Sequence, residues 1–150
     1  MITIGTARAV ADLSEGLVLA TVEVAAPPER TFEALASKDV LRWWVRPGVF
    51  DTRDWTGDMR PGGSWRASGI GGGKPYVLEG EFTEVVPPRK LVHSWKLAGG
   101  ESIVSYELEP ADGGTRVTLR HTGLVPRQTC AATCIGWETS FEELARMLGT

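Results

Sequence analysis

The sequence predicts an α+β fold in which a curved antiparallel sheet of about six to seven strands wraps around one long C-terminal helix. Short runs rich in β-branched and aromatic residues recur between turn residues from about residue 48 onward, which is typical of a meander. The closing segment places apolar residues at spacings of four and three from Cys130 to Leu148, which is one face of a helix. That helix can cover the apolar face of the sheet, which otherwise has no partner.

The first strong strand is expected over residues 17–25 (LVLATVEVA), which are rich in β-branched side chains. It must end at Pro27 and Pro28, because proline has no N–H to donate to a strand ladder. Residues 1–16 are weakly patterned and are interpreted as a lead-in segment or an edge strand.

Two short helices are expected after this strand. A proline suits the first helical turn, and Phe32, Leu35 and Ala36 recur at the spacing of one helical face. A second helix through residues 40–44 must stop near Arg46, because Pro47 and Gly48 follow.

Alternation assigns the faces of the later strands, because successive side chains of a strand point to opposite sides. The residues expected to face inward are Leu91, His93, Trp95, Leu97, Val104, Tyr106, Leu108, Val117, Leu119 and His121. Their neighbours in sequence are mostly polar, so each strand is expected to keep one solvated face.

Composition limits the classes of function. The 150 residues suit a single domain, 1–150, and a net charge of −3 with scattered Lys and Arg gives no basic patch for nucleic acid. No apolar run approaches the roughly 20 residues that span a bilayer, and no secretory leader precedes the first strand. Two cysteines cannot form a disulfide framework. We therefore expect a cytoplasmic protein that engages neither nucleic acid nor membrane.

Three stretches resemble one family. They are residues 24–44, the Gly62-Gly63-Ser64-Trp65 segment and the closing residues 136–148, with a double-proline turn between two strands at residues 80–92. In this order they are similar to the SRPBCC (START/Bet v 1-like) superfamily, in the branch of Hsp90 ATPase activator homologues (AHSA1-like). The resemblance covers roughly residues 17–148 and implies a helix-grip fold. It also implies a cavity between the sheet and the long helix, in which relatives mostly bind apolar molecules.

The six tryptophans and the two histidines supply the candidate site, because aromatic walls give contact area and ring N–H groups orient a ligand. The alternatives are a filled aromatic core and purely structural histidines. The candidate ligand-binding residues are Trp43, Trp44, Trp65, His93, Trp95, Tyr106, His121, Trp137 and Phe141.

The sequence favours a non-enzymatic protein that binds a small hydrophobic or aromatic molecule between the sheet and the last helix. One alternative is a cyclase-like or hydrolase-like enzyme that uses His93 or His121 for proton transfer. Another is a chaperone-related interaction module, and a homodimer through an exposed strand stays open. No catalytic residue, metal ligand or cofactor is assigned, and Cys130 and Cys134 are interpreted as packing residues.

Overall fold

The computed structural model describes residues 7–97 and 100–149. Within them, nine antiparallel strands form one sheet in the order β1-β2-β9-β8-β7-β6-β5-β4-β3, and α3 is the last element. The predicted class, a curved antiparallel sheet with a long C-terminal helix, is confirmed. The elements are β1 (Arg8–Asp12), β2 (Leu17–Val24), α1 (Pro28–Leu35), α2 (Val40–Trp43), β3 (Val45–Arg46), β4 (Phe50–Gly57), β5 (Ser64–Gly71), β6 (Lys74–Val86), β7 (Lys90–Leu97), β8 (Gly100–Ala111), β9 (Gly114–Thr122) and α3 (Arg127–Leu148).

The predicted count of about six to seven strands is too low, because β3 was not predicted and β1 was predicted only as one of two alternatives for residues 1–16. β1 lies at the edge of the sheet and pairs with β2 from Arg8 to Asp12, although its side chains are mostly exposed. β3 consists of two residues that pair with the start of β4. Both elements are held by backbone pairing, which leaves little trace in a hydrophobic pattern.

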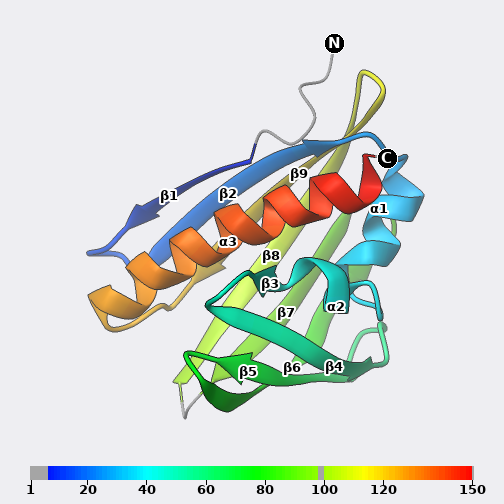
Figure 1. The fold of residues 1–150 in the computed structure, drawn as a ribbon. Helices are drawn as coiled ribbons and strands as arrows, with labels where there is room; N and C mark the ends of the chain where they lie inside the picture. Colours follow the sequence, from blue (N-terminus) through cyan, green and yellow to red (C-terminus); the bar gives the residue numbers. More distant parts are fainter. Residues whose placement is uncertain (1–6, 98–99, 150) are drawn as a thin grey trace.

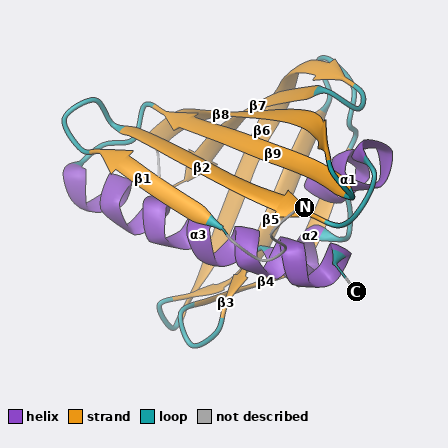
Figure 2. Cartoon of the chain, turned by 90° about the horizontal axis from the view of Figure 1, so that it is seen from above, coloured by secondary structure: helices purple, strands orange, loops and turns teal. Residues whose placement is uncertain are grey.

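The sheet curves around α3. Figure 1 shows α3 lying across one face of the sheet, with β1 and β2 along one side of the helix and β3, β4 and β5 on the other. Figure 2 shows the same arrangement from above, with β1 and β2 on one side of the helix and β3 on the other. The helix packs against β2, β1, α2 and β3. Its buried residues Cys130, Trp137, Phe141, Leu144 and Leu148 repeat at the predicted spacing.

The predicted inner faces of the later strands are confirmed by burial. His93 and His121 are 2% and 0% exposed, and Tyr106 is fully buried. Trp95 is half-buried and Leu97 is 42% exposed, so this inner face becomes accessible toward the end of β7. The helix therefore packs closely against the sheet over part of its length, and the two separate near the end of β7.

No helix among the described residues is both long and apolar enough to cross a membrane.

Candidate functional site

A cavity of about 540 Å³ lies where α3 and the inner face of the sheet separate. Its walls come from α3 and from strands β4 to β7, with Trp44 from the end of α2. The lining residues are Trp44, Phe50, Thr52, Gly71, Tyr76, Leu78, Trp95, Leu97, Gln128, Thr129, Ala132, Thr133, Gly136, Trp137 and Ser140.

Burial of the lining residues distinguishes the mouth of the cavity from its inner end. Leu97 of β7 and Gln128 and Ala132 of α3 are exposed, so they mark the mouth. Trp44 and Ser140 are each 4% exposed and lie at the inner end. The cavity therefore leads from solvent into the aromatic part of the core.

Small residues form a stripe along the α3 wall of the cavity. Along α3, Ala132, Gly136 and Ser140 follow one another at intervals of four residues and all line the cavity. On the sheet side, β5 contributes only Gly71 to the lining. The α3 stripe from Ala132 to Ser140 has no large side chain to fill the space in front of it.

Three of the predicted ligand-binding residues line the cavity: Trp44, Trp95 and Trp137. Their rings are in mutual contact, with centroid separations of 5.3 Å for Trp44–Trp95, 5.5 Å for Trp95–Trp137 and 6.5 Å for Trp44–Trp137. Together they form a continuous surface, here called the aromatic wall.

The other six predicted residues are not among the lining residues and pack behind the aromatic wall. Trp43 and Trp65 contact Trp44, His93 and His121 contact Trp95, and Tyr106 and Phe141 contact Trp137, all with centroid separations between 5.3 and 6.3 Å. All six are almost completely buried. They support the wall from the core side and do not line the cavity.

His121 belongs to a chain of buried hydrogen bonds. The indole N–H of Trp137 donates to His121 Nδ1 at 3.0 Å, so the neutral ring carries its proton on Nε2. That Nε2 lies 2.7 Å from Ser102 Oγ, which in turn donates to the Trp95 carbonyl at 3.4 Å. Burial is the main cause that lowers the pKa of His121 to about 3, and the nearby His93 adds to the effect. The ring is therefore neutral and held in one tautomer.

His93 is also neutral. Its Nδ1 lies 2.9 Å from the Ser94 carbonyl oxygen. Because a carbonyl oxygen can only accept a hydrogen bond, Nδ1 carries the proton. Burial lowers the pKa of His93 to about 4, against a smaller opposing effect of that hydrogen bond. Beside it, burial strongly raises the pKa of Tyr106, whose hydroxyl has no hydrogen-bond partner within the described chain.

Two polar residues meet on the sheet side of the cavity. The hydroxyls of Thr52 (β4) and Tyr76 (β6) form a short hydrogen bond, and Thr52 also donates to the Trp44 carbonyl at 2.7 Å. Burial raises the pKa of Tyr76, Asp51 adds to that rise, and the Thr52 hydrogen bond opposes it. The phenol is therefore neutral at physiological pH.

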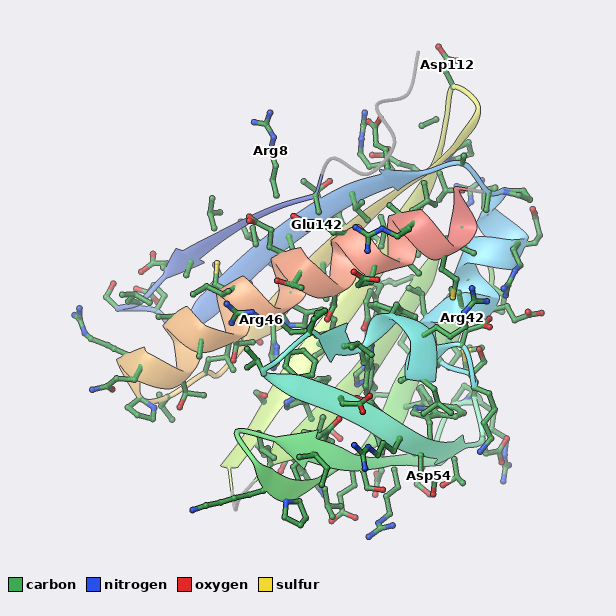
Figure 3. The ribbon with its side chains drawn as sticks, in the orientation of Figure 1. Arg8, Arg42, Arg46, Asp54, Asp112 and Glu142 are labelled. Atoms are coloured by element: carbon green, nitrogen blue, oxygen red, sulfur yellow. The ribbon has the colours of Figure 1, made fainter. Side chains whose placement is uncertain are left out.

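Charge is kept out of the cavity. No Asp, Glu, Lys or Arg is among the described residues that line it. Figure 3 shows Arg8, Asp54 and Asp112 at the periphery of the molecule, while Arg46 extends from β3 toward α3.

The described part of the chain contains no group of three or more His, Cys, Asp or Glu residues that could hold a metal ion. Cys130 is buried in the core and Cys134 is half-buried.

Most residues on the α3 side and on the β4–β6 side of the cavity were not predicted from the sequence. One available signal was the run Gln128, Ala132, Gly136 and Ser140, which places small or polar residues on one stripe beside the apolar face of the helix. The other signal was the pair Gly69 and Gly71 at alternate positions of a strand. Neither pattern shows by itself that the two surfaces face each other.

Comparison with known proteins identifies the family. The family model for the activator of Hsp90 ATPase homolog 1-like protein matches residues 25–149. The chain belongs to this AHSA1-like family. The predicted superfamily and branch are thereby confirmed, and the match includes both the aromatic wall and the whole of α3. No curated protein matches the chain in sequence.

Solved structures similar to this AHSA1-like chain share its fold. Protein Ms6760 from Mycobacterium smegmatis is 22% identical with a TM-score of 0.80, and the match covers 100% of this chain and 98% of that one. Protein CV1439 from Chromobacterium violaceum is 22% identical with a TM-score of 0.78, covering 90% and 98%. The AHSA1 protein from Silicibacter pomeroyi is 27% identical with a TM-score of 0.73, covering 88% and 96%.

Proposed function

We propose that this protein binds a small hydrophobic or aromatic molecule in the cavity between the sheet and α3, without transforming it. The observation that carries the proposal is the cavity of about 540 Å³ with the aromatic wall on one side. Small-molecule sites typically have volumes of roughly 300–1,000 Å³ and combine apolar walls with a few polar groups.

The lining favours an apolar ligand with little charge. The aromatic wall, Phe50 and Leu78 supply most of the large surfaces, and an apolar molecule that covers them is removed from water together with them. A charged group would lose its hydration in the inner part of the cavity, where no lining residue carries an opposite charge.

The enzyme alternative has less support from the positions of the histidines. Both rings are buried behind the aromatic wall, and their pKa values of about 4 and about 3 make them weak bases at neutral pH. Protonation of His121 at Nδ1 would also place a second hydrogen against the Trp137 N–H. We therefore assign both histidines to positioning of the wall.

The family description refers to the Hsp90 ATPase, but the feature that this molecule supplies is a cavity, so the proposed partner is a small molecule. A nucleic-acid or membrane partner is not part of the proposal. A cytoplasmic location is part of it, because Cys130 and Cys134 are free thiols, which suit a reducing compartment.

The test is a binding titration with N-phenyl-1-naphthylamine, a neutral dye whose fluorescence rises in apolar sites. The wild-type protein should bind one equivalent. Ala132→Trp places a large ring at the exposed mouth and should weaken binding at least tenfold, whereas Ile135→Trp, at a half-exposed position that does not line the cavity, should leave the Kd unchanged. Equal loss in both variants, or no binding by the wild type, would contradict the proposal.

Native mass spectrometry of freshly purified protein addresses the natural ligand. A mass above that of the denatured chain, lost in the Ala132→Trp variant but kept in Ile135→Trp, would assign the added molecule to the cavity.

A further inference from the structure

Three residues lie in one row across strands β4, β5 and β6. Thr52 pairs with Gly69, and Gly69 pairs with Tyr76, so all three share the inner face of the sheet. Gly69 has no side chain between the other two residues, and the Tyr76 hydroxyl reaches the Thr52 hydroxyl across β5, with the Tyr76 ring beside Gly71. A Cβ at position 69 would lie 2.0 Å from the Asp51 carbonyl oxygen, so the backbone itself requires glycine there. The strand register therefore brings Thr52 and Tyr76 together with no side chain between them.

The directions of these hydrogen bonds follow from the number of protons. The Trp44 carbonyl can only accept, so the single hydroxyl proton of Thr52 is committed to it, at 2.7 Å. Thr52 then has no proton left for Tyr76. The Tyr76 hydroxyl must be the donor in its short bond to Thr52.

With the hydrogen bonds in these directions, the phenolic oxygen of Tyr76 can still accept a hydrogen bond but has no proton left to donate. Tyr76 and Thr52 both line the cavity. Thr129, Thr133 and Ser140 on α3 line it too, and a hydroxyl that is free to rotate can serve as donor or acceptor. The hydroxyl of Tyr76 differs from these, because its role toward a ligand is fixed as that of an acceptor.

We propose that the cavity selects aromatic molecules that carry a hydroxyl or N–H donor, which binds to the phenolic oxygen of Tyr76. This inference rests on the proposed function, since it names the chemistry of the ligand in the same cavity. An acceptor group at this position would face the lone pairs of Tyr76 and lose its own hydration without a new partner. The raised pKa of Tyr76 keeps the phenol protonated, so the direction of the bonds holds at neutral pH.

The experiment compares 2-naphthol, which has a donor, with 2-methoxynaphthalene, which has the same rings and an acceptor only. Isothermal titration calorimetry gives both Kd values for the wild type, Tyr76→Phe and Thr52→Val, and the readout is the ratio of the two Kd values within each protein. Thr118→Val is the matched control for the Thr→Val change, because Thr118 lies on the outer face of β9.

In the wild type the ratio should favour 2-naphthol. Tyr76→Phe should reduce that preference by about fivefold, the usual worth of one hydrogen bond. Thr52→Val should act differently: it frees the Tyr76 proton, so 2-methoxynaphthalene should bind several-fold tighter than to the wild type. Thr118→Val should change neither Kd.

Two other outcomes would overturn different parts of the proposal. If both compounds bind and the ratio is the same in the wild type, Tyr76→Phe and Thr52→Val, the role of Tyr76 is wrong while cavity binding stands. If neither compound binds the wild type, cavity binding of small aromatic molecules fails, and the selection by Tyr76 fails with it. Circular dichroism of each variant checks that the fold is kept, and a result from either folded variant is sufficient.

Discussion

The indole N–H of Trp137 donates a 3.0 Å hydrogen bond to Nδ1 of His121, and both residues are buried. Through this bond, α3 and β9 fix each other at the inner end of the cavity. The same indole ring forms part of the aromatic wall, so the geometry of the wall depends on the protonation and tautomer of a histidine that does not line the cavity.

Replacing Trp137 with Phe should test this bond with a modest change of volume. The variant leaves His121 Nδ1 buried without its donor, and we expect the free energy of unfolding to fall by about 1–3 kcal/mol. Urea unfolding measures the loss. Long-range ¹H–¹⁵N NMR should find His121 protonated at Nε2 in the wild type and a changed tautomer population in the variant. An unchanged His121 spectrum would contradict the role given to Trp137.

The two histidines predict how stability depends on pH. Their folded pKa values, about 4 and about 3, lie below the ordinary value of 6.5, so the unfolded chain binds protons that the folded chain does not. Their contribution is fully present above pH 6.5 and is lost as the pH falls toward the folded pKa values. Between about pH 6 and pH 5 the free energy of unfolding should fall by up to about 1.4 kcal/mol per pH unit for each histidine.

Urea unfolding at pH 7.5, 6.0 and 5.0 measures this slope. Carboxylates stay mostly ionised in this range, so they add little to it. The His93→Gln variant should show about half the wild-type slope, whatever its absolute stability. A stability that does not change between pH 6.0 and 5.0 would mean that the histidines titrate normally.

Gly136 is expected to be a stabilising site for substitution. It lies in the middle of α3, and a Cβ there would meet only the Phe50 ring edge, at 3.8 Å. Gly136→Ala should therefore raise the free energy of unfolding by about 0.5–1 kcal/mol through helix propensity. Gly114→Ala is the contrasting case, because its Cβ would lie 1.8 Å from the Val24 carbonyl oxygen, and it should destabilise. Thermal unfolding of the two variants should shift in opposite directions.

The edge strand β1 is attached to α3 by the Ala9 N–H, which donates to Glu138 Oε2 at 3.0 Å. Glu138→Ala should remove this attachment and expose the edge, with faster hydrogen exchange at the Ala9 amide. Glu138→Gln keeps an acceptor oxygen and should retain most of the protection. Sedimentation at several concentrations would show whether the freed edge pairs with a second copy. Exchange at the Ala9 amide that stays as slow as in the wild type in both variants would mean that β1 is held by β2 alone.

The sequence by itself determined the class of fold, because alternation and helical spacing record which side chains face the core. The inward positions of Trp95, His121 and Trp137 follow from those two periods alone. The strands β1 and β3 leave a weaker signal, since backbone pairing holds them more than buried side chains do.

Only the tertiary structure decided which aromatic residues border open space. A periodic pattern says that a side chain faces inward, but not whether the opposing surface reaches it. Here the small residues of α3, such as Gly136, leave space in front of the sheet, so Trp44 borders a cavity while Tyr106 lies in the filled core. The proton order at Tyr76 likewise required Gly69 and Thr52 to lie in one row, which is a matter of strand register rather than of local sequence.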